Sequence, residues 1–238
     1  MGSFFVDFSL EIWFNIYGSE WMVSMDEITY GKVLDEKSSK VKQLYWNIAF
    51  GLQEVDEVAT AIYEILSDGA FRFDYLTYKN YHKRLFKNLS KEKYNPGEFR
   101  TYNFTKDEPI LNDDTVDYQS YDLIEEKEVN YIIMDQEQLI DRIVEFTSRI
   151  WQIHPFQEGN TTTTAVFIQK YLLSMGVKVN NGLFKDNALY FRNALVRANY
   201  INYVKGIKSD KKYLIMFFEN LLLEKNIVFK YLLVLNLL

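Results

Sequence analysis

The chain has 238 residues, a formal net charge of −6, no cysteine, 10 glycines and 3 prolines. An acidic chain lacks the basic stripe typical of nucleic-acid binders, and a chain without cysteine forms neither disulfides nor cysteine-based metal sites. The length suits one domain with extensions, and the scarcity of glycine and proline favours helices. The absence of disulfides suits the cytoplasm, which is the expected location.

Both ends of the chain are apolar. The segment Phe4–Trp21 is interrupted by acidic residues and lacks the basic start and cleavage site of a signal peptide. The tail Ile227–Leu238 is shorter than the roughly 20 residues that a transmembrane helix needs, so no membrane span is expected. We expect both ends to pack on the core or on a partner. Two alternatives remain: a true start at Met22 or Met25, and a tail that follows a shifted reading frame.

The first half of the chain carries helical patterns up to a firm break. Helices are expected over Val41–Val55, from Val58 to about Asp68-Gly69, and over Phe73–Leu89. In the last of these, the side chains expected to point inward are Leu76, Leu85 and Phe86. The break is Asn95-Pro96-Gly97.

An alternating pattern over Phe99–Leu111 predicts short extended segments, and Tyr118–Met134 predicts a helix with exposed acidic positions. The clearest helix, Gln136–Ile153, ends at His154-Pro155 because proline disfavours a helical residue before it. Its apolar face comprises Leu139, Ile140, Ile143, Phe146, Ile150 and Ile153, and its expected outward residues are Asp141, Arg142, Glu145 and Arg149.

Three further helices are expected over Thr161–Met175, Asn187–Tyr203 and Lys211–Leu223, the first closed by Gly176. The sequence therefore predicts an all-α fold with one small β-hairpin. The acidic residues Asp113, Asp114 and Asp117 are expected to form a solvated turn, since they lack the spacing of a Ca²⁺ loop.

The segment His154-Pro155-Phe156-Gln157-Glu158-Gly159-Asn160 lies between two of these helices. The following helix begins with unpaired backbone N–H groups, which form an anion site, and Gly159 lets the backbone approach a phosphate. Glu158 is a suitable Mg²⁺ ligand, and His154 can act as a base. The alternative is purely structural: a packed or capping histidine beside a polar turn.

The segment resembles the first half of the Fic (filamentation induced by cAMP) signature, His-Pro-Phe-x-Asp/Glu-Gly-Asn-Gly-Arg-x-x-Arg. The resemblance extends over about Val58 to Leu223. Its further parts are Tyr81–Phe86 with Gly97-Glu98-Phe99-Arg100, the flap-like Lys106–Leu111, Tyr190–Leu195 and, more weakly, Gln43–Asp56 as the remnant of a regulatory segment.

The resemblance implies a Fic-type helical bundle with a β-hairpin flap. It also implies transfer of AMP from ATP to a Tyr, Ser or Thr hydroxyl of a target protein, with ATP and Mg²⁺ as cofactors. His154 would be the catalytic base and Glu158 the metal ligand. The implied nucleotide-binding residues are Phe156, Gly159, Asn160, Thr161 and Thr162, and the implied target-docking residues are Lys106, Asp107, Glu108, Pro109, Ile110 and Leu111. Phe156 would also anchor the loop in the core.

The chain departs from the signature after Asn160. Thr161, Thr162 and Ala165 stand where the family has Gly, Arg and Arg. Thr161 is a mild change, since many relatives carry Thr there, whereas a lost charge-assisted hydrogen bond costs about 10- to 150-fold in transition-state binding. Weakened adenylylation is therefore expected. The alternatives are a pseudoenzyme that only binds a nucleotide or partner, and transfer of another phosphate-containing group. Arg192 and Arg197 are expected to be surface or structural residues rather than replacements for the missing arginines.

The inhibitory pattern Ser/Thr-x-x-x-Glu-Gly/Asn of many relatives finds no match. Ile215 precedes Glu219-Asn220, and Ile65 follows Thr60–Glu64. An inhibitor would therefore be an antitoxin-like partner in trans, or the terminal segments once encoded it.

His82, the other histidine, is expected to pack or cap. The expected domains are an extension over residues 1–57, a Fic domain over 58–225 and a tail over 226–238.

Overall fold

The computed structural model describes residues 12–16, 19–23, 54–100, 115–179 and 181–229. The chain divides into two units, residues 1–55 and 56–238. In the first unit, β1 (Ile12–Ile16) pairs antiparallel with β2 (Ser19–Val23), with Ile12 opposite Val23 and Ile16 opposite Ser19. The sequence did not predict this hairpin.

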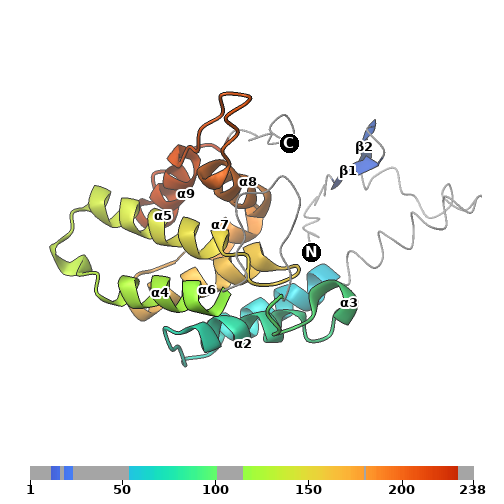
Figure 1. Ribbon diagram of the computed structural model, residues 1–238, viewed down its shortest axis with the longest axis horizontal. Coiled ribbons are helices and arrows are strands. Elements are labelled where there is room, and N and C mark those ends of the chain that lie inside the picture. Colours follow the sequence, from blue (N-terminus) through green and yellow to red (C-terminus); the bar gives the residue numbers. More distant parts are fainter. Residues whose placement is uncertain (1–11, 17–18, 24–53, 101–114, 180, 230–238) are drawn as a thin grey trace, which may run out of the picture. The chain divides into compact units, whose positions relative to one another are not determined.

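The second unit is helical (Figure 1). A helix over residues 54–67 leads into it. The later elements are α2 (Tyr75–Phe86), α3 (Lys91–Tyr94), α4 (Thr115–Lys127), the 3₁₀ helix η2 (Tyr131–Ile133), α5 (Gln136–Gln152), α6 (Asn160–Ser174), α7 (Asn181–Asp186), α8 (Ala188–Asn199) and α9 (Lys212–Leu223). Within the described part of this unit, the only β-pairing is an isolated bridge between Asn202 and Ile207. The predicted all-α fold is confirmed, while the predicted flap at residues 106–111 and most of the predicted helix Val41–Val55 lie outside the described residues. The last two residues of that prediction, 54 and 55, belong to the helix over residues 54–67.

Helix α5 is the centre of the unit, because it packs against α4, α6, α8 and α9. It begins with a capping box: Asp135 accepts a hydrogen bond from the Gln138 N–H at 2.9 Å, and the Gln138 side chain accepts one from the Asp135 N–H at 3.1 Å. Its predicted apolar face is confirmed, since Ile140, Ile143 and Ile150 are buried along with Phe146. Helix α6 also packs on α2.

Two predicted helix ends were wrong. Helix α8 ends at Asn199 rather than Tyr203, because the backbone becomes extended at Tyr200 and then turns back through the Asn202–Ile207 bridge. The helix predicted to reach Met134 ends at Lys127 and is followed by the separate turn η2, which Asn130 caps.

The predicted inward position of Leu76 was also wrong, since this residue is 55% exposed. The buried residues of α2 are Tyr78, Tyr81, His82, Leu85 and Phe86. At about 100° per residue, Leu76 lies half a turn away from Leu85, so both cannot face the core.

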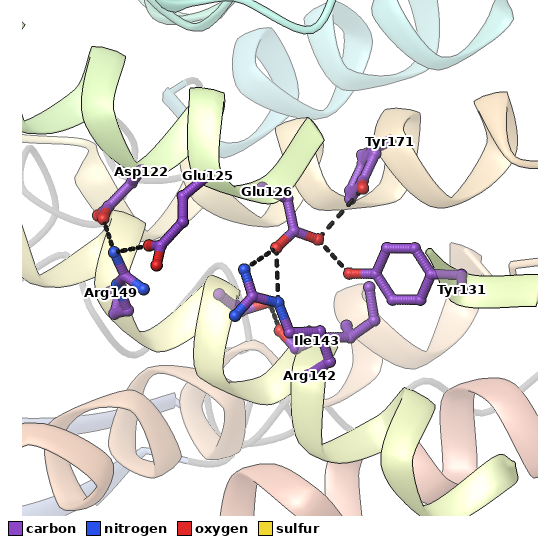
Figure 2. A network of polar contacts seen from close by, with 9 residues as sticks. Asp122, Glu125, Glu126, Tyr131, Arg142, Ile143, Arg149 and Tyr171 are labelled. Carbon is purple, nitrogen blue, oxygen red and sulfur yellow. Dashed lines mark hydrogen bonds and ion pairs between the residues drawn. The ribbon is translucent and has the colours of Figure 1, made fainter. Parts of the chain in front are cut away.

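Helix α4 is held on α5 by ion pairs, which corrects the predicted outward positions of Arg142 and Arg149 (Figure 2). The Arg142 guanidinium lies 2.8 Å from the buried carboxylate of Glu126, and Arg149 pairs with Asp122 and Glu125. The second Glu126 oxygen accepts hydrogen bonds from the hydroxyls of Tyr131 and Tyr171.

Burial raises the pKa of Glu126, although its hydrogen-bond donors and Arg142 oppose the shift. The sequence predicted that the acidic positions of this helix are exposed, and for Glu126 on α4 this prediction was wrong. Among the described residues, no helix is both long and apolar enough to cross a membrane.

Candidate active site

The loop that carries His154 joins α5 to α6, and Arg100, which lies earlier in the chain, stabilises this loop through hydrogen bonds. The buried Arg100 donates from Nε to the carbonyl of His154 at 2.7 Å and from Nη2 to that of Ile153 at 3.4 Å. Its backbone N–H donates to the carbonyl of Pro155 at 2.9 Å. A guanidinium at the carbonyl end of a helix also complements the helix dipole. Arg100 belongs to the Gly97-Glu98-Phe99-Arg100 motif, but the motif alone does not predict this role.

His154 has a left-handed backbone, with φ of 45°, and a partly exposed side chain. Its ring nitrogen Nδ1 lies 2.8 Å from the carbonyl oxygen of Trp151, which can only accept. The neutral ring therefore carries its proton on Nδ1 and its lone pair on Nε2, which is the nitrogen that can take a proton from a substrate.

Phe156 anchors the loop, as the sequence predicted, because its side chain is fully buried. Its ring stacks on that of His82, with centroids 3.7 Å apart. His82 in turn accepts a hydrogen bond at Nδ1 from the Gly97 N–H at 2.9 Å, so its Nε2–H donates to the carbonyl of Glu158 at 3.0 Å. The predicted packing role of His82 is confirmed, and His82 also ties the Gly97 turn to the loop.

The backbone conformation of Gly159 and its contact with Phe86 both require glycine at this position. Its φ is +81°, and a Cβ added there would lie 2.4 Å from the Phe86 ring. A side chain at this position would therefore force apart the packing of the loop on α2.

Asn160 closes the loop through its side chain. Its Oδ1 accepts from the Phe156 N–H at 2.9 Å, and its Nδ2 donates to the Phe156 carbonyl at 2.8 Å. The buried amide is thus committed to the loop backbone, which leaves the backbone N–H as the part of Asn160 that could face a ligand.

Helix α6 begins at Asn160, and its N-cap residue, Gly159, has no side chain that could cap it. The first N–H groups of a helix lack partners inside the helix, and the helix dipole adds positive potential there. Glu158, exposed beside this helix start, accepts from the Gly159 N–H at 3.2 Å. A phosphate could bind the backbone N–H groups, while the carboxylate could bind a cation shared with that phosphate.

The two positions that depart from the signature lie on α6. Thr162 is partly exposed in the first turn, whereas Ala165 packs against the core. Arg197 does not replace the missing charge there, because it binds the Lys208 carbonyl at 3.1 Å and lies 3.8 Å from Asp210. Arg192 is an exposed residue of α8.

Among the described residues, no three or more His, Asp or Glu side chains gather as a metal site. A single carboxylate such as that of Glu158 suits Mg²⁺ that is bound mainly by phosphates and water. The predicted docking residues 106–111 lie outside the described residues.

The fold and this loop define an all-α domain of the Fic type. Residues 72–172 match the model of the Fic/DOC family, so the chain contains a Fic/DOC family domain. The comparison with curated proteins found no match.

Three solved structures share the fold. The N-terminal FIC domain of the VirB-translocated effector Bep8 from Bartonella sp. 1-1C is 17% identical, with a TM-score of 0.54, covering 79% of this chain and 88% of that one. The effector BepC from Bartonella tribocorum, with bound AMPPNP, is 14% identical, with a TM-score of 0.53 and coverages of 71% and 84%. The N-terminal Fic domain of a Bep effector from Bartonella sp. AR 15-3 is 18% identical, with a TM-score of 0.57 and coverages of 82% and 89%.

Proposed function

We propose that this protein transfers AMP from ATP to a Tyr, Ser or Thr hydroxyl of a target protein, at a rate lowered by the loss of the signature arginines. The observation that carries the proposal is the hydrogen bond from His154 Nδ1 to the Trp151 carbonyl, beside the uncapped start of α6. It supplies a base of defined tautomer next to an anion site. The AMPPNP bound to BepC, a protein of the same fold, supports a nucleotide at this fold's site.

In the proposed reaction, His154 takes the proton of the target hydroxyl at Nε2. The hydroxyl oxygen forms a bond to the α-phosphorus of ATP, the bond from that phosphorus to the β-phosphate breaks, and pyrophosphate leaves. The backbone N–H groups of Asn160, Thr161 and Thr162 stabilise the charge that develops on the α-phosphate. Glu158 would hold Mg²⁺, which would supply positive charge to neutralise phosphate oxygens. The segment Lys106–Leu111 aligns the target by strand addition.

The test is mass spectrometry of a cell lysate treated with the full chain and Mg-ATP, beside the same treatment with His154→Ala. We expect an AMP adduct on protein that disappears with the variant. An adduct of another mass would assign a different phosphate-containing group. Absence of any adduct with the folded wild-type chain would overturn the transfer activity.

The second candidate is a domain that binds a nucleotide without transfer, and Thr162 and Ala165 favour it. Calorimetry with Mg-ATP, run beside the lysate experiment, separates the candidates, because this one predicts binding without an adduct.

The variant Thr162→Arg tests why transfer is slow. One regained charge-assisted hydrogen bond should raise the transfer rate by about 10- to 150-fold. The matched neutral variant Thr162→Gln should not. Equal rates for both variants would show that the missing charge does not limit the reaction.

A further inference from the structure

Trp151 holds His154 at two places. Its carbonyl oxygen accepts from the His154 backbone N–H at 3.1 Å and from ring Nδ1 at 2.8 Å. Its indole ring lies edge-on to the imidazole, with centroids 4.5 Å apart and an angle of 81° between the planes. The position of the imidazole therefore depends on the position of Trp151.

The indole of Trp151 is itself held from across the loop. Trp151 is 7% exposed, and its Nε1–H donates to the hydroxyl of Thr161 at 3.0 Å. A buried indole N–H needs an acceptor, since it can only donate. Thr161 stands where the Fic signature has glycine, and glycine has no side chain that could accept this bond.

We propose that Thr161 is a positioning residue for His154, acting through Trp151. The hydroxyl fixes the indole, the indole fixes the plane of the imidazole, and the Trp151 carbonyl keeps the ring proton on Nδ1. The hydrogen bond from the Trp151 indole to Thr161 also joins the last turn of α5 to the first turn of α6. It therefore fixes the position of His154 relative to the start of α6. The departure at Thr161 thereby adds a contact to the loop. The value of this contact for catalysis rests on the proposed function, but the geometry does not.

Thr161→Val and Thr161→Ser separate the hydroxyl from the shape of the side chain. Valine keeps the volume and loses the acceptor, whereas serine keeps the acceptor. The full chain has only 2 histidines and 4 tryptophans, so ¹⁵N-labelled rings can be assigned by NMR with His82→Gln and Trp151→Phe variants.

In wild type and Thr161→Ser, we expect a protected Trp151 indole N–H and a neutral His154 ring with its proton on Nδ1. In Thr161→Val, the indole N–H should exchange with solvent about fivefold faster, the change that a net hydrogen bond provides. The His154 ring nitrogens should then report a mixture of both tautomers. Unfolding curves establish that each variant is folded, so a general loss of structure cannot produce the shift.

An unchanged His154 tautomer in folded Thr161→Val would overturn the inference, as would an equal change in Thr161→Ser. An inactive wild-type chain would overturn the proposed function alone, because the ring measurements need no turnover.

Discussion

Asn160 shows that a residue placed correctly in a motif can also have a structural role that the motif does not reveal. The sequence predicts a nucleotide-binding residue, and that role of its backbone stays a prediction. The structure places the buried amide on the backbone of Phe156, with both hydrogen bonds under 3 Å. A motif gives the identity and spacing of residues, but it does not separate the atoms that meet a ligand from those that hold the loop.

Asn160→Ala should lower the free energy of unfolding by about 2–5 kcal/mol, because it leaves a buried N–H and a buried carbonyl of Phe156 without partners. Asn187→Ala is the matched control, since it removes one partly buried hydrogen bond, to the Leu183 carbonyl. This bond lies outside the loop between α5 and α6. Asn187→Ala should cost about 1 kcal/mol. Urea unfolding followed by circular dichroism measures both, and equal small losses would refute the structural role of Asn160.

The burial of His82 should make the free energy of unfolding depend on pH. Burial lowers the pKa of its fully buried ring from 6.5 to about 4, and the hydrogen bond to Glu158 opposes the shift only in part. Because the unfolded chain binds the proton more tightly, the stability from neutral His82 is present above pH 6.5 and is lost as the pH falls toward 4. The full loss is about 3 kcal/mol.

The measurement is the free energy of unfolding from pH 7 to pH 4 for wild type and for His82→Gln. The variant should be less stable at pH 7 and should lack this part of the slope. Parallel curves for the two proteins would contradict the account of His82.

At the scale of elements, the sequence predicted helices well wherever a long apolar face repeats, as in α5. The sequence was a poor guide to which side chains of a helix are buried. Its apolar side chain predicts an inward position for Leu76, but Tyr78 and His82 form the buried face of α2 with Leu85. Arg142 was placed outward because it is charged, although a buried carboxylate on α4 faces it. Such a pair joins two different helices, so helical periodicity within one segment cannot reveal it.

The ion pair of Arg142 with Glu126 predicts how substitutions between α4 and α5 change the stability of the fold (Figure 2). Arg142→Met should cost about 3–5 kcal/mol of unfolding free energy, because it leaves the charge of Glu126 buried without its partner. Adding Glu126→Gln should recover most of the loss, since glutamine still accepts from Tyr131 and Tyr171 without a charge. Thermal and urea unfolding test both variants, and a double variant no more stable than Arg142→Met would disprove this explanation.

At the scale of the whole molecule, the family and the all-α fold could be predicted because a short, ordered motif lies between two strongly periodic helices. The supports of that motif could not. His82 reaches the loop from α2, Arg100 from the turn after α3 and Trp151 from the end of α5, and only the folded chain brings these places together. The candidate catalytic motif is local in sequence, whereas two of the residues that hold it, Arg100 and His82, are more than 50 residues away from His154.

The central claim is that the start of α6 binds a triphosphate with the His154 ring beside the α-phosphorus. A crystal structure of the full chain with Mg²⁺ and a non-hydrolysable ATP analogue tests it most directly. We predict phosphate oxygens on the backbone N–H groups of Asn160, Thr161 and Thr162, the metal on Glu158, and His154 Nε2 facing the α-phosphate. A nucleotide bound elsewhere, or a loop whose His154 ring faces away from the phosphates, would contradict the account.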